Sequence, residues 1–172
     1  MQAGRFVLYQ SISPSRATHL WAVTVAGDRE PIAIAQTSFQ ETNGRFSPDS
    51  GWISFQSNET GRAEIYVQRF PGAGGKGQVS TNGGTDPKWR RDGREIFFLA
   101  PDNRLMSVSI SLPQDGSQIQ LGNPAPLFTL PSASDYAVTP DGQRVLVNVP
   151  SGEATVPPIT VVLNWRRPGD TK

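Results

Sequence analysis

Runs of alternating apolar and polar residues, each bounded by turn-forming residues, recur along the whole chain. An apolar residue at every second position is typical of a β-strand, whose side chains point alternately to two faces. Three such runs follow a similar short turn, in which an aspartate precedes a small residue. The aspartates of these turns, Asp49, Asp92 and Asp141, are 43 and 49 residues apart. The pattern is therefore an internal repeat.

Each repeat supplies further strand candidates at matching offsets. In each repeat, the strand that comes after the alternating run described above is predicted at residues 20–25, 64–70, 105–110 and 159–164. A weaker outer strand is predicted at residues 31–35, 78–81 and 126–130. The first copy of the repeat starts at Gly4 and lacks the strand that precedes the turn, and the last copy lacks the outer strand. Fourteen strands are therefore expected.

Four short antiparallel strands in about 45 residues are the unit of a β-propeller blade. The sequence thus predicts an all-β fold, a propeller fragment with two complete and two partial blades. Residues 1–172 are expected to be one segment, with a partial blade at 4–39, blades at 44–82 and 86–130, and a partial blade at 135–165. The turn aspartates are predicted to accept hydrogen bonds from turn amides, which is a structural role.

The composition narrows the fold class and the partners. Seventeen Gly and 15 Pro leave no stretch longer than 12 residues free of both, which excludes long helices and the folds built from them. Sixteen Lys and Arg against 15 Asp and Glu give a net charge of +1, so we expect neither a nucleic-acid partner nor membrane contact from this segment. The chain has no cysteine, no signal segment and no apolar stretch long enough to span a membrane. The sequence does not identify the compartment, and the parent region of this segment could be extracytoplasmic.

Little in the sequence predicts catalysis. The one histidine, His19, has no acidic residue beside it in the sequence, and the chain has no Gly-x-Ser-x-Gly segment that would supply a nucleophile for it to activate. We therefore expect His19 to lie on the surface or rim. The acidic residues lack calcium-loop spacing. We therefore expect no catalytic residue, no metal site and no cofactor. Large rings at strand positions are predicted to fill the space between blades: Trp21, Trp52, Phe55, Tyr66, Phe97 and Phe98.

The best candidate for a binding site is a group of cations on the innermost strands, which line the central channel of a propeller. When the repeats are aligned on their turn aspartates, Arg45 matches Lys88, and Arg90 lies two residues further along. Arg45, Lys88 and Arg90 could form a cationic channel for an anionic peptide or small molecule. The alternative is that these side chains are solvated or paired.

Several segments resemble the TolB-like propellers that are built from repeats with a Ser-Pro-Asp-Gly turn. Residues 61–72, 77–84 and 87–95 are similar in particular to blades of the propeller at the carboxyl end of bacterial serine/threonine protein kinases, and residues 159–165 are similar to its terminus. The resemblance implies a non-catalytic interaction or sensing scaffold with a protein or peptide partner. The chain itself contains no kinase motif. The alternative is the substrate-gating propeller of a prolyl oligopeptidase-like hydrolase.

Incomplete blades at both ends predict association between copies. Such a propeller usually has six or more blades, and a partial blade leaves a strand edge and an apolar face without a neighbour. We therefore expect a homo-oligomer in which partial blades of different chains complement each other. The pattern does not identify a ligand, because loop and channel residues vary freely in a repeat fold.

Overall fold

The computed structural model describes residues 5–14, 17–72, 74–113, 118–131 and 135–149, and the backbone of 160–163. These residues form fifteen strands and no helix, which confirms the all-β fold. The strands are β1 (Phe6–Ile12), β2 (Thr18–Thr24), β3 (Ile32–Ala35), β4 (Glu41–Phe46), β5 (Trp52–Ser57), β6 (Glu64–Arg69), β7 (Gly77–Gln78), β8 (Thr85–Trp89), β9 (Glu95–Leu99), β10 (Arg104–Ser111), β11 (Gln120–Leu121), β12 (Ala125–Thr129), β13 (Asp135–Val138), β14 (Arg144–Asn148) and β15 (Thr160–Leu163). The described part of the chain thus offers no helix for crossing a bilayer.

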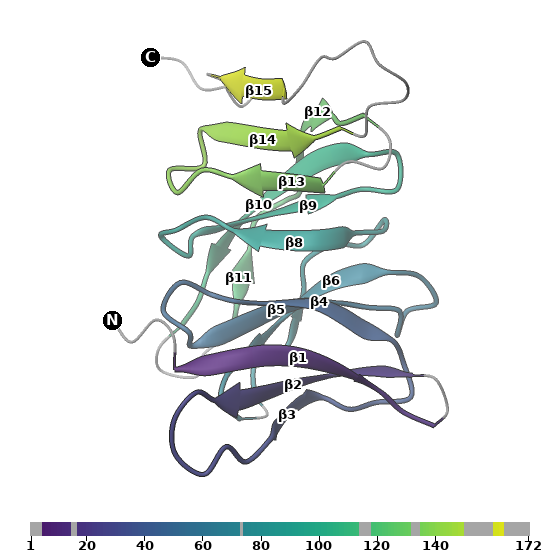
Figure 1. Ribbon diagram of the computed structural model, residues 1–172. Coiled ribbons are helices and arrows are strands. Elements are labelled where there is room, and N and C mark those ends of the chain that lie inside the picture. Colours follow the sequence, from purple (N-terminus) through teal and green to yellow (C-terminus); the bar gives the residue numbers. More distant parts are fainter. Residues whose placement is uncertain are drawn as a thin grey trace.

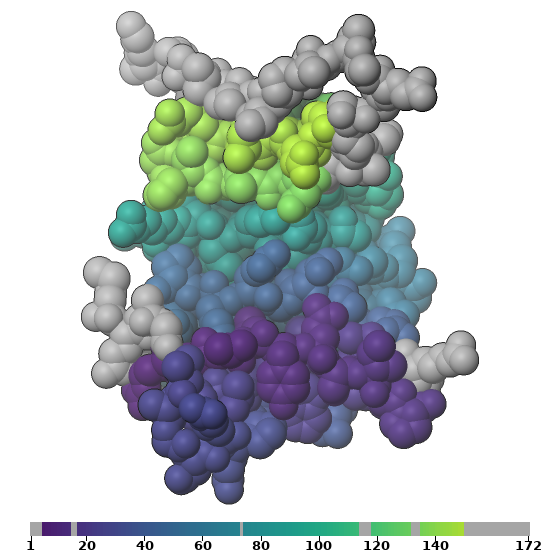
Figure 2. Space-filling view, in the orientation of Figure 1, coloured from purple at the N-terminus to yellow at the C-terminus, as the bar shows by residue number. Residues whose placement is uncertain are grey.

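The strands form four antiparallel sheets that follow each other in chain order. Their strand orders are β1-β2-β3, β4-β5-β6-β7, β8-β9-β10 with β11 and β12 outside, and β13-β14-β15. Figure 1 looks onto one edge of the stack, where β1, β4, β8 and β13 lie one above another. The space-filling view shows the sheets as successive bands (Figure 2). This is the arrangement of neighbouring propeller blades, so the predicted fold class is confirmed.

The third sheet has one strand more than the sequence predicts, because its outer strand is split. β11 pairs with the end of β10 at Ile110 and Ser111, whereas β12 pairs with the beginning of β10. Gly122 and Pro124 lie between the two pieces. Proline has no amide hydrogen for the ladder, and glycine weakens a strand interior, so the outer edge is interrupted there.

In the described part of the chain, the first sheet has no strand inside β1. β4, β8 and β13 each pair with the strand that follows them, but β1, among the described residues, pairs only with β2. Its register with β2 places Leu8 opposite Ala22 and Tyr9 opposite Trp21. The inner side of β1 is therefore an open strand edge in the described structure.

Three apolar cores lie between consecutive sheets. On β5, Ile53 and Phe55 belong to the core shared with the first sheet, whereas Trp52 belongs to the core shared with the third sheet. A third core, which includes Phe97, joins the third and fourth sheets. The inner sheets are thus buried on both faces, which explains why successive residues of β5, β6 and β9 are buried.

One of the predicted core rings lies elsewhere. Trp52, Phe55, Tyr66, Phe97 and Phe98 are all buried, with at most 3% of their surface exposed. Trp21 is only half-buried, because its neighbours Leu20 and Ala22 take the face of β2 that packs against the second sheet. Trp21 points to the opposite face, where its indole Nε1 donates to Ser11 Oγ over 2.8 Å.

Candidate functional site

The three repeated turns hold the innermost strands in place. In each turn the residue after the aspartate, namely Ser50, Gly93 or Gly142, has a positive φ, and its amide donates to the first turn residue over 2.8 to 3.0 Å. Each aspartate accepts a hydrogen bond of 3.0 Å from the amide two residues further on. The turn aspartates therefore have the structural role predicted for them.

Two innermost strands carry a bulge at the same place. The register shifts between Thr42 and Arg45 in β4, and between Thr85 and Lys88 in β8. Asn43 has φ 54° and Asp86 has φ 52°, a region that Asn and Asp adopt more readily than most residues. Because a bulge redirects the side chains beside it, the two strands present Arg45 and Lys88 from equivalent positions.

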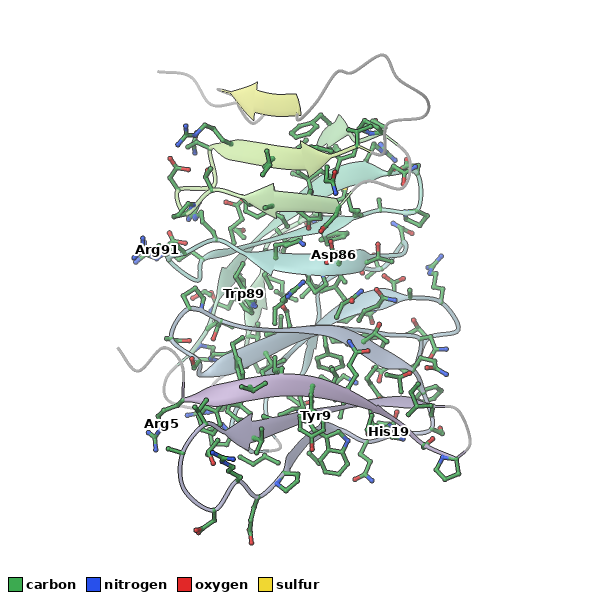
Figure 3. The ribbon with its side chains drawn as sticks, viewed as in Figure 1. Arg5, Tyr9, His19, Asp86, Trp89 and Arg91 are labelled. Carbon is green, nitrogen blue, oxygen red and sulfur yellow. The ribbon has the colours of Figure 1, made fainter. Side chains whose placement is uncertain are left out.

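Charges of both signs alternate along this edge of the stack. Lys88 Nζ lies 3.1 Å from Asp86 Oδ2 and 3.3 Å from Asp135 Oδ1. Arg45 Nη2 lies 4.0 Å from Asp86 Oδ1. Figure 3 shows Asp86 on β8, in the middle of the edge. We call Arg45, Asp86, Lys88 and Asp135 the inner-edge array; it crosses β4, β8 and β13.

The middle of the array is firmly held, and its ends are open. Lys88 Nζ lies 4.7 Å above the ring of Tyr136, whose hydroxyl donates to the Asp86 carbonyl over 2.7 Å. Burial, together with the charges of Asp86 and Asp135, raises the pKa of Tyr136 well above its ordinary value, so this donor keeps its proton. The hydrogen bond from Lys88 lowers the pKa of Asp135. The side chains of Arg45 and Asp135 are 53% and 74% exposed.

Of the three predicted channel cations, the structure brings Arg45 and Lys88 together and places Arg90 elsewhere. The Arg90 guanidinium donates two hydrogen bonds of 2.7 Å to Asp92 and one of 2.8 Å to Glu95. The Arg90 contact lowers the pKa of Asp92. Arg90 thus takes the place of a turn hydroxyl, since Ser47 and Thr139 bond to the aspartates of the other two turns.

The sequence reasoning missed the carboxylates of the array. Asp86 and Asp135 occupy the same repeat position, two residues before the position shared by Arg45 and Lys88. The same alignment on turn aspartates could have found them. With the carboxylates present, the edge has balanced charge: two cations lie beside two anions.

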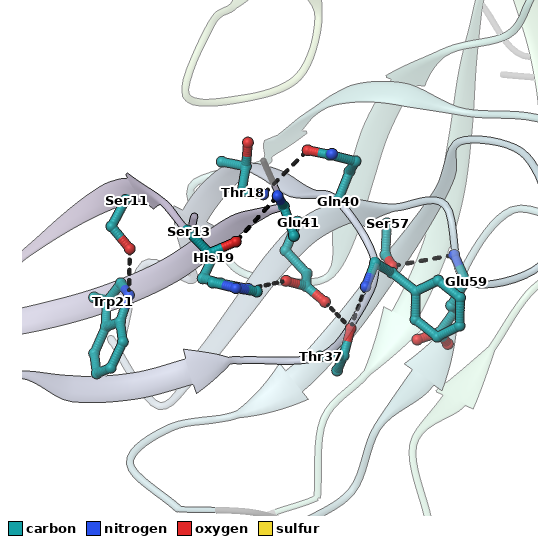
Figure 4. A network of polar contacts seen from close by, with 12 residues as sticks. Ser11, Ser13, Thr18, His19, Trp21, Thr37, Gln40, Glu41, Ser57 and Glu59 are labelled. Atoms are coloured by element: carbon teal, nitrogen blue, oxygen red, sulfur yellow. Dashed lines mark hydrogen bonds and ion pairs between the residues drawn. The ribbon is translucent and has the colours of Figure 1, made fainter. Parts of the chain in front are cut away.

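The prediction for His19 was wrong. The side chain is buried, and Nδ1 lies 3.2 Å from Glu41 Oε2, while the Thr37 hydroxyl donates to the other oxygen of Glu41 (Figure 4). Glu41 comes from the second sheet, 22 residues further along the chain, so the flanking residues gave no sign of it. The pair ties the first two sheets together. The described residues contain no group of three or more potential metal ligands.

Comparison with known proteins identifies the fold. The chain matches no protein-family model and no curated protein. It is similar to the structure of TolB from Acinetobacter baumannii, with a TM-score of 0.64, 15% identity, and coverage of 94% of this chain and 38% of that one. It is also similar to the β-propeller domain of Myceliophteria thermophila Cps50 (Swd1), with a TM-score of 0.56, 11% identity, and coverage of 91% and 54%. The chain therefore has a β-propeller architecture and spans about half or less of these proteins' length.

Proposed function

We propose that this chain is a non-catalytic β-propeller scaffold that binds a protein or peptide partner along its inner edge. The inner-edge array carries the proposal. Its exposed ends are a cation, Arg45, and an anion, Asp135, held in fixed positions by Lys88 and Asp86 between them. Fixed charges of both signs select a partner and its orientation more than they attract any one charged molecule.

The surroundings of the single histidine support a role without catalysis. A nucleophilic site needs a hydroxyl or thiol against the base, with a carboxylate behind it. Within the described part of the chain, Glu41 is the one hydrogen-bond partner of the His19 ring. The sequence resemblance to the propeller region of bacterial serine/threonine kinases points to the same kind of role. The sequence also leaves an alternative function, that of a propeller that gates substrate entry in a prolyl oligopeptidase-like hydrolase.

Peptides selected on the wild-type chain from a random displayed library are expected to bind Arg45→Ala about tenfold more weakly, because a charge-assisted contact is worth about 1.5 kcal/mol or more. Fluorescence anisotropy with the labelled synthetic peptide measures the change. Arg104→Ala is the matched control, since the Arg104 side chain is 52% exposed and pairs with Asp102 outside the array. Equal binding by the wild type and Arg45→Ala would contradict the proposal.

We further propose that two copies associate through their end sheets. Val7 and Tyr9, on the face of β1 that points away from the second sheet, are 50% and 38% exposed, and Leu146 on β14 is 45% exposed. Propeller blades bury both faces, so these residues lie where a neighbouring blade would cover them. One chain spans 54% of the Swd1 propeller domain, so two copies supply about the blades of one ring.

Light scattering coupled to size-exclusion chromatography is expected to give the mass of a dimer or a larger assembly for the wild type, and of a monomer for Val7→Glu. The buried carboxylate would have to lose its water without a partner. Ile12→Glu is the control, because Ile12 lies on the same strand but on its opposite face and is 76% exposed. A wild-type chain that stays monomeric at every concentration overturns the proposal.

A further inference from the structure

A second surface, away from the inner-edge array, is a cleft between the second and third sheets. Its volume is about 920 Å³, at the upper end of the range for ligand pockets. The walls come from the β4–β5 turn at Pro48 and Asp49, the β8–β9 turn at residues 90–94, the end of β10, and β11 with Gly122. The cleft thus extends from the turns beside the innermost strands to the outermost strand.

The side chains of two arginines in this cleft make no hydrogen bond or ion pair within the turn that carries them. Arg90 replaces the turn hydroxyl, as described above, but Arg91 and Arg94 stand where the other two aspartate turns have proline and either glycine or glutamine. Both are exposed, and neither side chain has a hydrogen-bond or ion-pair partner among the residues described. Figure 3 shows Arg91 at the outer tip of the β8–β9 turn.

The carboxylates of the cleft are bonded to groups other than Arg91 and Arg94. Asp49 accepts hydrogen bonds from Ser47 Oγ over 2.6 Å and from the Gly51 amide. Both oxygens of Asp92 are bonded to Arg90. The wall of the cleft therefore carries three arginines against two aspartates, and the guanidinium groups of Arg91 and Arg94 have no bonded carboxylate among the described residues.

The rest of the wall provides apolar surface. Leu112 and Leu121 are partly buried against the core between the second and third sheets, and both line the cleft. Three strand spacings of about 4.8 Å separate β8 from β11, so the cleft is about 14 Å across the sheet. An extended chain rises about 3.3 Å per residue, so about four residues of a peptide span this width.

We propose that this cleft binds an extended acidic segment of a protein partner, with its carboxylates on Arg91 and Arg94 and its apolar side chains on Leu112 and Leu121. The planar guanidinium of arginine bonds a carboxylate through two parallel hydrogen bonds, which fixes position as well as charge. The site is separate from the inner-edge array, so either can fail without the other.

Nuclear magnetic resonance titration with a hexapeptide of alternating Glu and Leu tests the site. Saturable shifts are expected for the amides of Gly93, Ser109 and Gly122, which lie in the wall of the cleft. Arg91→Glu and Arg94→Glu should each weaken binding about tenfold or more, because charge reversal replaces attraction by repulsion. Arg144→Glu is the control: it makes the same change in net charge on an exposed arginine outside the cleft. A hexapeptide of alternating Lys and Leu should not bind.

The proposal is overturned by any of four results. These are no saturable shift at millimolar peptide, shifts that map to other residues, an equal loss of binding in Arg144→Glu, and an equal response to glutarate, which would make the cleft a site for small anions. Circular dichroism melting curves show whether each variant is folded. Arg45→Ala should leave this titration unchanged, which separates the cleft from the inner-edge site.

Discussion

Glu64→Ala is expected to lower the free energy of unfolding by about 2–4 kcal/mol, the cost of leaving the buried Ser80 hydroxyl and Gly83 amide without an acceptor. The Glu64 side chain is 1% exposed. Its carboxylate accepts hydrogen bonds from Arg62 Nε over 2.8 Å, from the Gly83 amide over 2.9 Å and from the Ser80 hydroxyl. Without it, the Gly83 amide remains buried with no acceptor.

The same substitution should also disturb the chain segment that leads into β8 and the inner-edge array. Ser80 and Gly83 lie in the segment between β7 and β8, and β8 carries Asp86 and Lys88. Glu64 therefore fixes the chain where it crosses from the second sheet to the third. We expect Glu64→Ala to weaken peptide binding at the inner edge as well as stability.

Urea unfolding followed by tryptophan fluorescence measures the loss of stability, with Glu59→Ala as the control. Glu59 pairs with Lys76 on the same sheet, but the two side chains are 24% and 37% exposed. Exposed pairs contribute about 0–1 kcal/mol, so this variant should differ little from the wild type. Similar losses in the two variants would show that Glu64 stabilises the chain no more than a surface charge does.

The fold was predictable because a propeller repeats its local signals. Residues that are adjacent in the sequence determine the turns at Asp49, Asp92 and Asp141. They also determine the alternation of apolar and polar residues in the strands that follow, so both features can be read from a single sequence. The split of the outer strand into β11 and β12 was missed. It depends on where Gly122 and Pro124 interrupt pairing with β10, and the sequence pattern there is weak.

The candidate site was only partly predictable, because its contacts join residues of different sheets. Alignment of the repeats placed Arg45 and Lys88 together and could also have placed Asp86 and Asp135 at one repeat position. The contacts between these cations and carboxylates follow only from the packing of neighbouring sheets. Arg90 was misplaced because its repeat position is occupied by turn hydroxyls in the other copies.

The contacts that join consecutive sheets were also not predictable from the sequence, because each joins residues far apart in the chain. His19 lies opposite Ser11, and Glu64 lies opposite Ser57, so both occupy the same position in their sheets. Each reaches the chain segment that leads into the next sheet, His19 through Glu41 and Glu64 through Gly83. The repeat therefore determines the position at which a side chain joins two sheets, and the residue at that position determines which hydrogen bond or ion pair it forms.

Phe97→Ala and Phe98→Ala are expected to cost about 3–5 kcal/mol each, as is usual when a buried phenylalanine is truncated, but to loosen different parts of the chain. The two rings are adjacent on β9 and are 0% and 2% exposed. Phe97 belongs to the core with Tyr136 and Val145 of the fourth sheet, whereas Phe98 belongs to the core with Ile65 of the second sheet. Each variant is thus the matched control of the other.

Hydrogen exchange distinguishes the two variants, because stacked repeats contact mainly their neighbours and can open one interface at a time. Phe97→Ala should speed exchange in β13 and β14 and leave β5 and β6 protected, since within the described residues the fourth sheet packs only against the third. Phe98→Ala should speed exchange in β6 and β9 as the second and third sheets separate. If both variants instead loosened all four sheets equally, the stack would unfold as one cooperative unit, and the three cores would not act as separate interfaces.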